Sequence, residues 1–180
     1  TKLLKALNQL QSTPFPIRVI QPVVRYFKGL AAGLSGQQMI DYQDIAVAVQ
    51  RPDFVSALHS SHPALHALLR DICSITMLKG SSKINVVPPV AEAEVDCRML
   101  PDRAASAFVE DFKARVAGEG LTVDLTMAFS PAISDASSSL IESIQATLSA
   151  LHPGARFAFS VASGFTDSHF TRDLGIQSYG

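Results

Sequence analysis

Residues 91–99 have the sequence Ala-Glu-Ala-Glu-Val-Asp-Cys-Arg-Met, and this stretch decides the fold class. Every second residue is apolar, and the residues between them are charged. Side chains of a β-strand point alternately to the two faces of a sheet, so the pattern predicts a strand with one buried and one solvated face. Strands of this kind are typical of antiparallel sheets.

A second alternating stretch and an intervening helix lie downstream. Residues 121–127 again place apolar side chains at every second position, so they predict another half-buried strand. Between the two stretches, apolar residues recur at every fourth position over residues 104–116, the spacing of an amphipathic helix. Asp102 is the expected N-cap of this helix, which should end at Gly118 or Gly120.

Upstream segments complete an α+β pattern. Residues 73–79 and 83–87 predict two strands joined by a Gly-Ser-Ser turn, and leucines at helical spacing predict a helix over residues 1–12. Residues 17–71 are apolar but irregular and predict short helices, with an interruption at Pro63 that fits either two short helices or one kinked helix. Helices beside antiparallel strands predict an open-faced α+β sandwich, with an antiparallel sheet and its helices on one face.

The pattern changes again beyond the second alternating stretch. Residues 140–151 predict a helix, and residues 157–161 predict a strand covered on both faces. Helices that alternate with strands of this kind are typical of an α/β domain with a parallel sheet. We therefore expect a first domain over residues 1–129, with an extra helical region near 17–71, and an incomplete α/β segment over residues 130–180.

The composition excludes some classes of function. The chain has 180 residues, a formal net charge of −1 and no block of Lys or Arg, so it lacks the field that nucleic-acid or anionic-membrane binding requires. No window resembles a membrane span. Cys73 and Cys97 have neither CxxC spacing nor a second pair, so we interpret them as buried small hydrophobic residues, without a disulfide framework or a zinc knuckle.

Three histidines form the first candidate site. His59, His62 and His66 are three and four residues apart, a spacing that can bring imidazoles onto one helix face and hold a metal ion. Pro63 interrupts the helix between them, and no cysteine is near. The pattern therefore favours surface histidines over a metal site, and we predict no metal ligand in this chain.

The solvated face of the first strand carries a row of charges, namely Glu92, Glu94, Asp96 and Arg98. Neighbours on one strand face are about 7 Å apart, and a solvated face needs charged residues in any case, so the three carboxylates are interpreted as surface. Arg98 ends the row where the strand leaves the sheet, and its guanidinium could bind a carboxylate through two hydrogen bonds. A plain surface arginine is the alternative.

Residues 163–169, Ser-Gly-Phe-Thr-Asp-Ser-His, follow a predicted strand and lead into a helix. Ligands of open α/β sheets bind at such places, and free backbone N–H groups there favour anions. A Ser/His/Asp triad is excluded because these residues are too close in sequence to orient one another. We predict a substrate-contacting turn in which Thr166 and Asp167 also cap the helix; a cap without further function is the alternative.

Several of these segments together resemble one enzyme family. They are an Asn-Val-x-Pro segment at residues 85–88, an Asp-x-Arg-x-x-Pro segment at residues 96–101 and a Thr-Asp-Ser turn at residues 166–168. In this order, they look like the aminoacylase, acetylornithine deacetylase and glutamate carboxypeptidase family of zinc-dependent exopeptidases and amidohydrolases. The resemblance covers most of residues 72–180.

The resemblance implies a lid, or dimerisation, domain inserted into a catalytic domain that holds two zinc ions. Asn85 and Arg98 match lid residues that hold the substrate's amide and carboxylate, and Thr166 matches a contact from the catalytic domain, with Gly164 beside it. The implied substrate is a small N-acyl amino acid or peptide, cleaved next to a free carboxylate by a metal-activated water. A homodimer through the lid is also implied, with lid residues of one subunit reaching the other's site.

The chain departs from the family pattern at the metal centre. No stretch supplies the family's zinc ligands, and His169 lies in the wrong turn to replace the late histidine ligand. We therefore expect a fragment that carries no catalytic residue and is inactive alone, completed by segments outside it. The alternative is a non-catalytic dimerisation or interaction module. The sequence indicates no cellular compartment.

Overall fold

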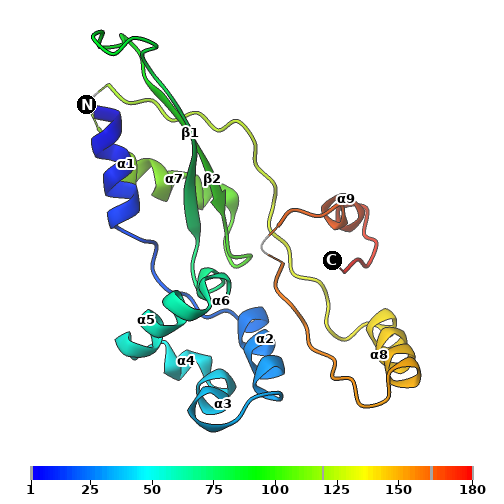
Figure 1. Cartoon of the computed structure of the whole chain (residues 1–180). Helices are drawn as coiled ribbons and strands as arrows, with labels where there is room; N and C mark the ends of the chain where they lie inside the picture. The colour runs from blue at the N-terminus through cyan, green and yellow to red at the C-terminus, as the bar shows by residue number, and fades with distance from the viewer. Residues whose placement is uncertain (1, 119, 163, 180) are drawn as a thin grey trace. The chain divides into compact units, whose positions relative to one another are not determined.

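The computed structural model describes residues 2–118, 120–162 and 164–179 (Figure 1). The chain divides into two compact units, each made of two stretches of sequence. The first unit contains residues 1–16 and 71–131, and the second contains residues 17–70 and 132–180. In the described part of the chain, no helix has both the length and the apolar composition that a membrane crossing requires.

A two-stranded antiparallel ribbon is the centre of the first unit. Strand β1 (Ile72–Lys79) pairs with strand β2 (Glu92–Arg98), from the pair Ile72 and Arg98 at one end to the pair Lys79 and Glu92 at the other. Along β2 the charged residues are exposed and the residues between them are half-buried. The alternation predicted from residues 91–99 is therefore confirmed.

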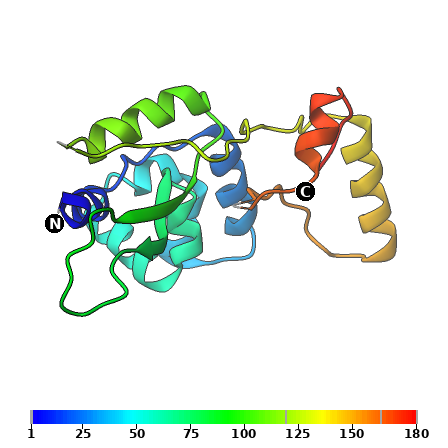
Figure 2. The same ribbon diagram turned by 90° about the horizontal axis from the view of Figure 1, so that it is seen from above.

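Two helices pack on the apolar face of this ribbon. Helices α1 (Lys2–Ser12) and α7 (Ala105–Val116) contact each other, and α1 also contacts β1. The shared core has five buried members, Ala6, Leu10, Phe15, Phe108 and Val116, with the inward residues of both strands packed against it. The segment after α7 turns back alongside this helix (Figure 2). The predicted α+β fold with helices on one face of an antiparallel sheet is confirmed.

Cys73 and Cys97 are directly opposite in the ribbon and form a disulfide, with their Cα atoms 4.1 Å apart. The interpretation as two separate buried residues was therefore wrong. Both side chains lie on the inward face of their strands, and the antiparallel register makes them nearest neighbours. That register depends on how two distant segments pair, which cysteine spacing does not show.

Two predicted strands of the first unit are not formed. Residues 83–87 belong to the exposed connection between β1 and β2, and residues 121–127 run without regular structure. Leu121 and Val123 nevertheless pack against the core. A strand needs a neighbour for its backbone hydrogen bonds, and within the described residues β1 and β2 pair only with each other. The expected N-cap was also wrong, because α7 begins at Ala105 with Ala104 in the capping position.

The irregular segment 17–70 forms a cluster of five short helices with its own core. They are α2 (Gln21–Ala31), α3 (Gly36–Gln43), α4 (Ile45–Ala48), α5 (Pro52–Ser61) and α6 (Pro63–Ala67). Val23, Phe27 and Ile45 are completely buried in it. The predicted interruption at Pro63 separates α5 from α6. The two ends of the segment meet, because the N–H of Arg18 donates to the carbonyl of Leu69 at 2.8 Å.

The rest of the second unit contains helices α8 (Ser139–Leu151) and α9 (Ser168–Asp173). Ser138 caps α8 by accepting a hydrogen bond from the N–H of Ile141. Residues 157–161 do not form the predicted doubly covered strand: their burial alternates between half-buried and exposed. The described residues offer this segment no strand to pair with.

Candidate functional site

Arg98 lies at the end of β2 on the solvated face of the ribbon. Its Nε and Nη2 atoms donate to one carboxylate oxygen of Asp96, at 3.0 and 2.7 Å. The two side chains are two positions apart on one strand face and about half exposed, 46% and 48%. The guanidinium can therefore be reached from solvent, and an incoming carboxylate would compete with Asp96 for it.

Asn85 lies in the connection between β1 and β2, and Arg98 lies at the end of β2 away from that connection. Figure 1 shows this connection at one end of the ribbon. This connection, residues 80–91, is called the ribbon loop below. The Ser81 hydroxyl organises its start, donating to the carbonyl of Lys83 at 3.0 Å and accepting from the N–H of Lys83 at 3.1 Å. Four apolar side chains of the ribbon loop are exposed: Ile84, Val86, Val87 and Val90.

The structure does not bring Asn85 and Arg98 together. Arg98 is opposite Ile72 at one end of the ribbon, whereas the ribbon loop begins after Lys79 at the other end. Seven residues of β2 separate these ends, a span on the order of 20 Å at about 3.3 Å per residue. One small substrate therefore does not touch both side chains of a single subunit.

Gly164 and Thr166 lie in the second unit, in the turn before α9. The Thr166 hydroxyl accepts a hydrogen bond from the N–H of Ser168 at 3.2 Å, as predicted for a capping residue. Asp167 stands at the N-cap position without a side-chain capping bond, so its predicted capping role was wrong. A side chain added at Gly164 would meet no atom within 4 Å, so this side of the turn is open. Ser163, the first residue of the predicted turn, is outside the described residues.

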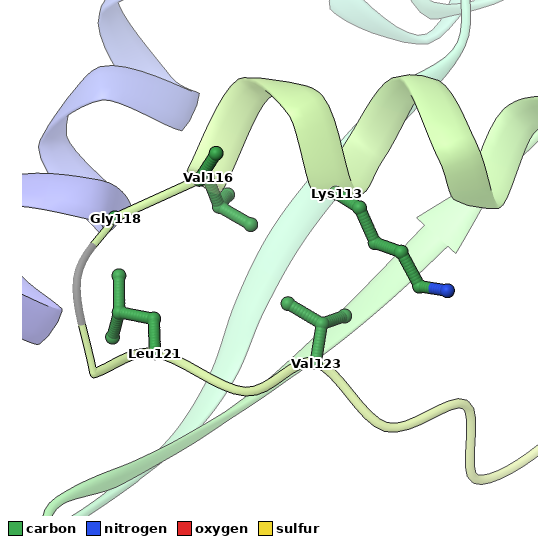
Figure 3. A pocket seen from close by; sticks show the side chains of 6 residues that line it. Lys113, Val116, Gly118, Leu121 and Val123 are labelled. Atoms are coloured by element: carbon green, nitrogen blue, oxygen red, sulfur yellow. The ribbon is translucent and has the colours of Figure 1, made fainter.

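A hollow of about 300 Å³ lies beside the C-terminal end of α7 (Figure 3). Val116, Leu121 and Val123 line it, and none of the predicted site residues does. The amine of Lys113 points away from these apolar side chains and lies 3.1 Å from a Glu110 carboxylate oxygen. Among the described side chains that line the hollow, only Lys113 carries a polar group, and this group is not directed into it to orient a substrate.

A polar hollow of about 190 Å³ in the second unit was missed by sequence reasoning. It is lined by Ser134, Arg172 and Tyr179 among others, and Arg172 Nη1 donates to the Ser134 hydroxyl at 2.9 Å. The Nε atom of Arg172 is buried and has no hydrogen-bond partner in the described part of the chain. The residues come from segments about forty positions apart, so no local signal marks the hollow.

The three candidate histidines divide into a pair and a single residue. Nδ1 of His59 and Nδ1 of His66 are 3.3 Å apart, whereas Nδ1 of His62 is 2.9 Å from the Ser61 hydroxyl. Burial, the nearby Arg70 guanidinium and the His59 ring all lower the pKa of His66 below its ordinary value. Within the described residues, no three or more His, Cys, Asp or Glu side chains gather where they could hold a metal ion. The donor set of a two-zinc centre therefore does not fit the described residues.

The first unit is thus an antiparallel ribbon with two helices on one face and a solvent-exposed arginine at one end. A family model described as "Peptidase dimerisation domain" matches residues 1–124 of this chain. The chain belongs to this family, and it carries the dimerisation domain of the M20 metallopeptidases. The resemblance found in the sequence motifs is thereby confirmed.

Curated relatives all bear one name, N-fatty-acyl-amino acid synthase/hydrolase PM20D1. The protein of Homo sapiens is 25% identical over 186 aligned positions, which cover 98% of this chain and 36% of the relative. The protein of Mus musculus is 31% identical over 77 residues, 43% of this chain and 15% of the relative. The chain thus spans about a third of the human relative's length. No solved structure matches the chain.

Proposed function

We propose that this chain is the dimer-forming and substrate-contacting part of a zinc-dependent hydrolase that cleaves an amide bond next to a free carboxylate. The family match over residues 1–124 carries the proposal, because it identifies a peptidase accessory domain. Arg98 supports the carboxylate side of it, because its guanidinium is solvent-accessible and is already engaged by one carboxylate, that of Asp96. Residues 1–129 are then the lid, with the helical region near 17–71 as an addition to it, and residues 130–180 belong to the catalytic part.

The relatives' name supports a more specific substrate class, N-acyl amino acids with a long acyl chain. A fatty acyl chain needs an apolar wall to exclude water. Exposed Ile84 and Val87 lie one and two positions from Asn85 in the ribbon loop, and there they could form this wall beside the acyl side of the amide. We assign the amide contact to Asn85 and the contacts from the catalytic part to Gly164 and Thr166.

A homodimer through the lid reconciles these contacts with the ribbon's length. Asn85 and Arg98 are at opposite ends of β1 and β2, so one substrate meets both only if they come from different subunits. In the described part of the chain neither edge of the ribbon pairs with a further strand, and unpaired edges are places where a second copy can pair. The two zinc ions would be held by residues outside those described, and this chain's own part is binding and orientation.

The test uses the whole protein that contains this chain. We expect zinc-loaded enzyme to release free amino acid from N-acyl amino acids, with rates that rise with acyl length, and to sediment as a dimer. Failure to hydrolyse any N-acyl amino acid after zinc is restored would contradict the proposal. A dimer without hydrolysis would instead support a non-catalytic dimerisation module, the alternative that a match to a dimerisation domain also allows.

A further inference from the structure

The contact between His59 and His66 exists because the helix is broken between them. His59 is in α5, His66 is in α6, and only His62 separates the two helices. In a continuous helix, residues seven positions apart are separated by about 10.5 Å along the axis. The Nδ1 atoms are instead 3.3 Å apart, because the chain changes direction at His62 and Pro63.

The separation of the two nitrogens matches that of two ligands of one metal ion. Two nitrogen ligands at about 2.0–2.1 Å from a tetrahedral zinc ion lie about 3.3 Å from each other. The ring centroids are 4.7 Å apart with planes inclined at 67°, so the rings converge at their Nδ1 edges without stacking. From this geometry we propose that His59 and His66 together bind a first-row transition-metal ion, with zinc best suited, and leave its other positions to water or a further ligand.

The charges around the pair favour binding in one respect and oppose it in another. A metal ion requires unprotonated imidazoles, and burial, with Arg70 and His59, lowers the pKa of His66, which favours the unprotonated form of this ring. The Arg70 guanidinium also repels an incoming cation. His62 is turned to the Ser61 hydroxyl. The described residues thus supply two ligands and one opposing charge, which predicts a site of moderate affinity.

A hydrogen bond between two neutral imidazoles is the competing explanation for the same distance. One ring would then donate its Nδ1 proton to the other, and a metal ion would have no special affinity for the pair. The two explanations differ in whether the pair has any special affinity for a metal ion. A two-ligand metal site is weakened by loss of either His59 or His66, whereas metal held nonspecifically by surface histidines depends equally on His62.

The experiment titrates the chelator-stripped 180-residue chain with zinc chloride and with copper chloride in a calorimeter. We expect one ion to bind per chain, and His59→Gln and His66→Gln each to weaken binding about tenfold or more. His62→Gln is the matched control and should change the affinity by less than about twofold. Arg70→Gln should tighten binding, because it removes the opposing charge while keeping both ligands.

Copper supplies a second readout that does not depend on affinity. Electron paramagnetic resonance of the copper-loaded chain should show coupling to two imidazole nitrogens, and to one in either single variant. Circular dichroism of the metal-free variants checks that each still folds. Equal losses in His62→Gln and His59→Gln, or binding no tighter than that of free imidazole, would overturn the proposal.

Discussion

The carboxylate of Asp71 is completely buried and lies 2.7 Å from Nη2 of Arg103. Its other oxygen accepts the backbone N–H of Leu100 at 2.8 Å. Arg103 in turn reaches Asp111 of α7 at 3.3 Å, and its guanidinium lies over the ring of Phe108. One buried acid therefore joins the start of β1, the segment after β2 and the helix that covers them.

Removing this acid should destabilise the first unit. Asp71→Ala leaves the Leu100 N–H and part of the Arg103 guanidinium without their buried partner, a loss of about 2 to 4 kcal/mol in the free energy of unfolding. Urea denaturation followed by circular dichroism measures it. Asp96→Ala breaks an exposed pair and should cost less than about 1 kcal/mol. Equal costs for the two variants would show that burial of Asp71 has no energetic consequence.

The disulfide between Cys73 and Cys97 should stabilise the ribbon. The two residues are 24 positions apart, and crosslinking a loop of that length lowers the entropy of the unfolded chain by an amount worth about 3 to 4 kcal/mol. We expect the double variant Cys73→Ser, Cys97→Ser to melt at a lower temperature than the oxidised protein. Reductant should lower the melting temperature of the parent chain and leave the variant unchanged. Free thiols detected in the unreduced protein by alkylation and mass spectrometry would contradict the pairing.

Arg98→Ala in the whole enzyme should lower kcat/KM, because the substrate carboxylate loses its charged partner. The expected loss of transition-state stabilisation is about 2 to 4 kcal/mol. Glu92→Gln, on the same solvated face but at the other end of β2, is the control and should leave kcat/KM nearly unchanged. Steady-state kinetics on one N-acyl amino acid is sufficient for this comparison. An Arg98→Ala enzyme as active as the parent would remove the arginine from the substrate contacts.

The ribbon loop should select substrates by the length of their acyl chain. Replacing Val87 or Ile84 by Ser should lower kcat/KM for a long-chain substrate, a loss of transition-state stabilisation of about 1 to 2 kcal/mol. The value of kcat/KM for an N-acetyl substrate should not change. Stability should change by less than about 0.5 kcal/mol, because both side chains are exposed. Val47→Ser, an exposed apolar position in α4, is the matched control. Equal losses on long and short substrates would place the loop away from the acyl chain.

Stability should decline at mildly acidic pH because of His66. Burial, followed by Arg70 and His59, lowers the pKa of this side chain in the folded protein below its ordinary value of 6.5. The unfolded chain therefore binds a proton where the folded chain does not, so the free energy of unfolding falls as the pH drops from 6.5 toward the lowered pKa.

Urea midpoints in the presence of a chelator, from about pH 7.5 down to about pH 5, measure this effect. His66→Gln should flatten the decline over this range, and His152→Gln should keep it. A decline of the same size in His66→Gln would assign the effect to another group.

Patterns confined to one element were predictable from the sequence. The alternation in residues 91–99 and the four-residue spacing in residues 104–116 each record which face of a single segment is buried, so β2 and α7 were expected. Pro63 was expected to interrupt a helix because its ring cannot occupy a helix interior. The family resemblance was likewise carried by short local motifs.

Features that depend on pairing between distant segments were not predictable. Residues 121–127 alternate as clearly as residues 91–99, but only the latter have a strand beside them in the described part of the chain. The disulfide follows from the register of β1 against β2, and the Asp71–Arg103 pair follows from the packing of α7. The separation of Asn85 from Arg98, in contrast, needs no pairing: it follows from the length of β2, because Asn85 lies in the loop before this strand and Arg98 at its far end.

The hydrogen bond from Arg18 to Leu69 closes the helical segment 17–70 on itself. An excursion of the chain that leaves and returns at neighbouring points can be lengthened, shortened or exchanged during evolution without shifting the register of the ribbon. Its buried residues form a core of their own. The segment can therefore change as a separate module while the ribbon and its two helices keep their geometry.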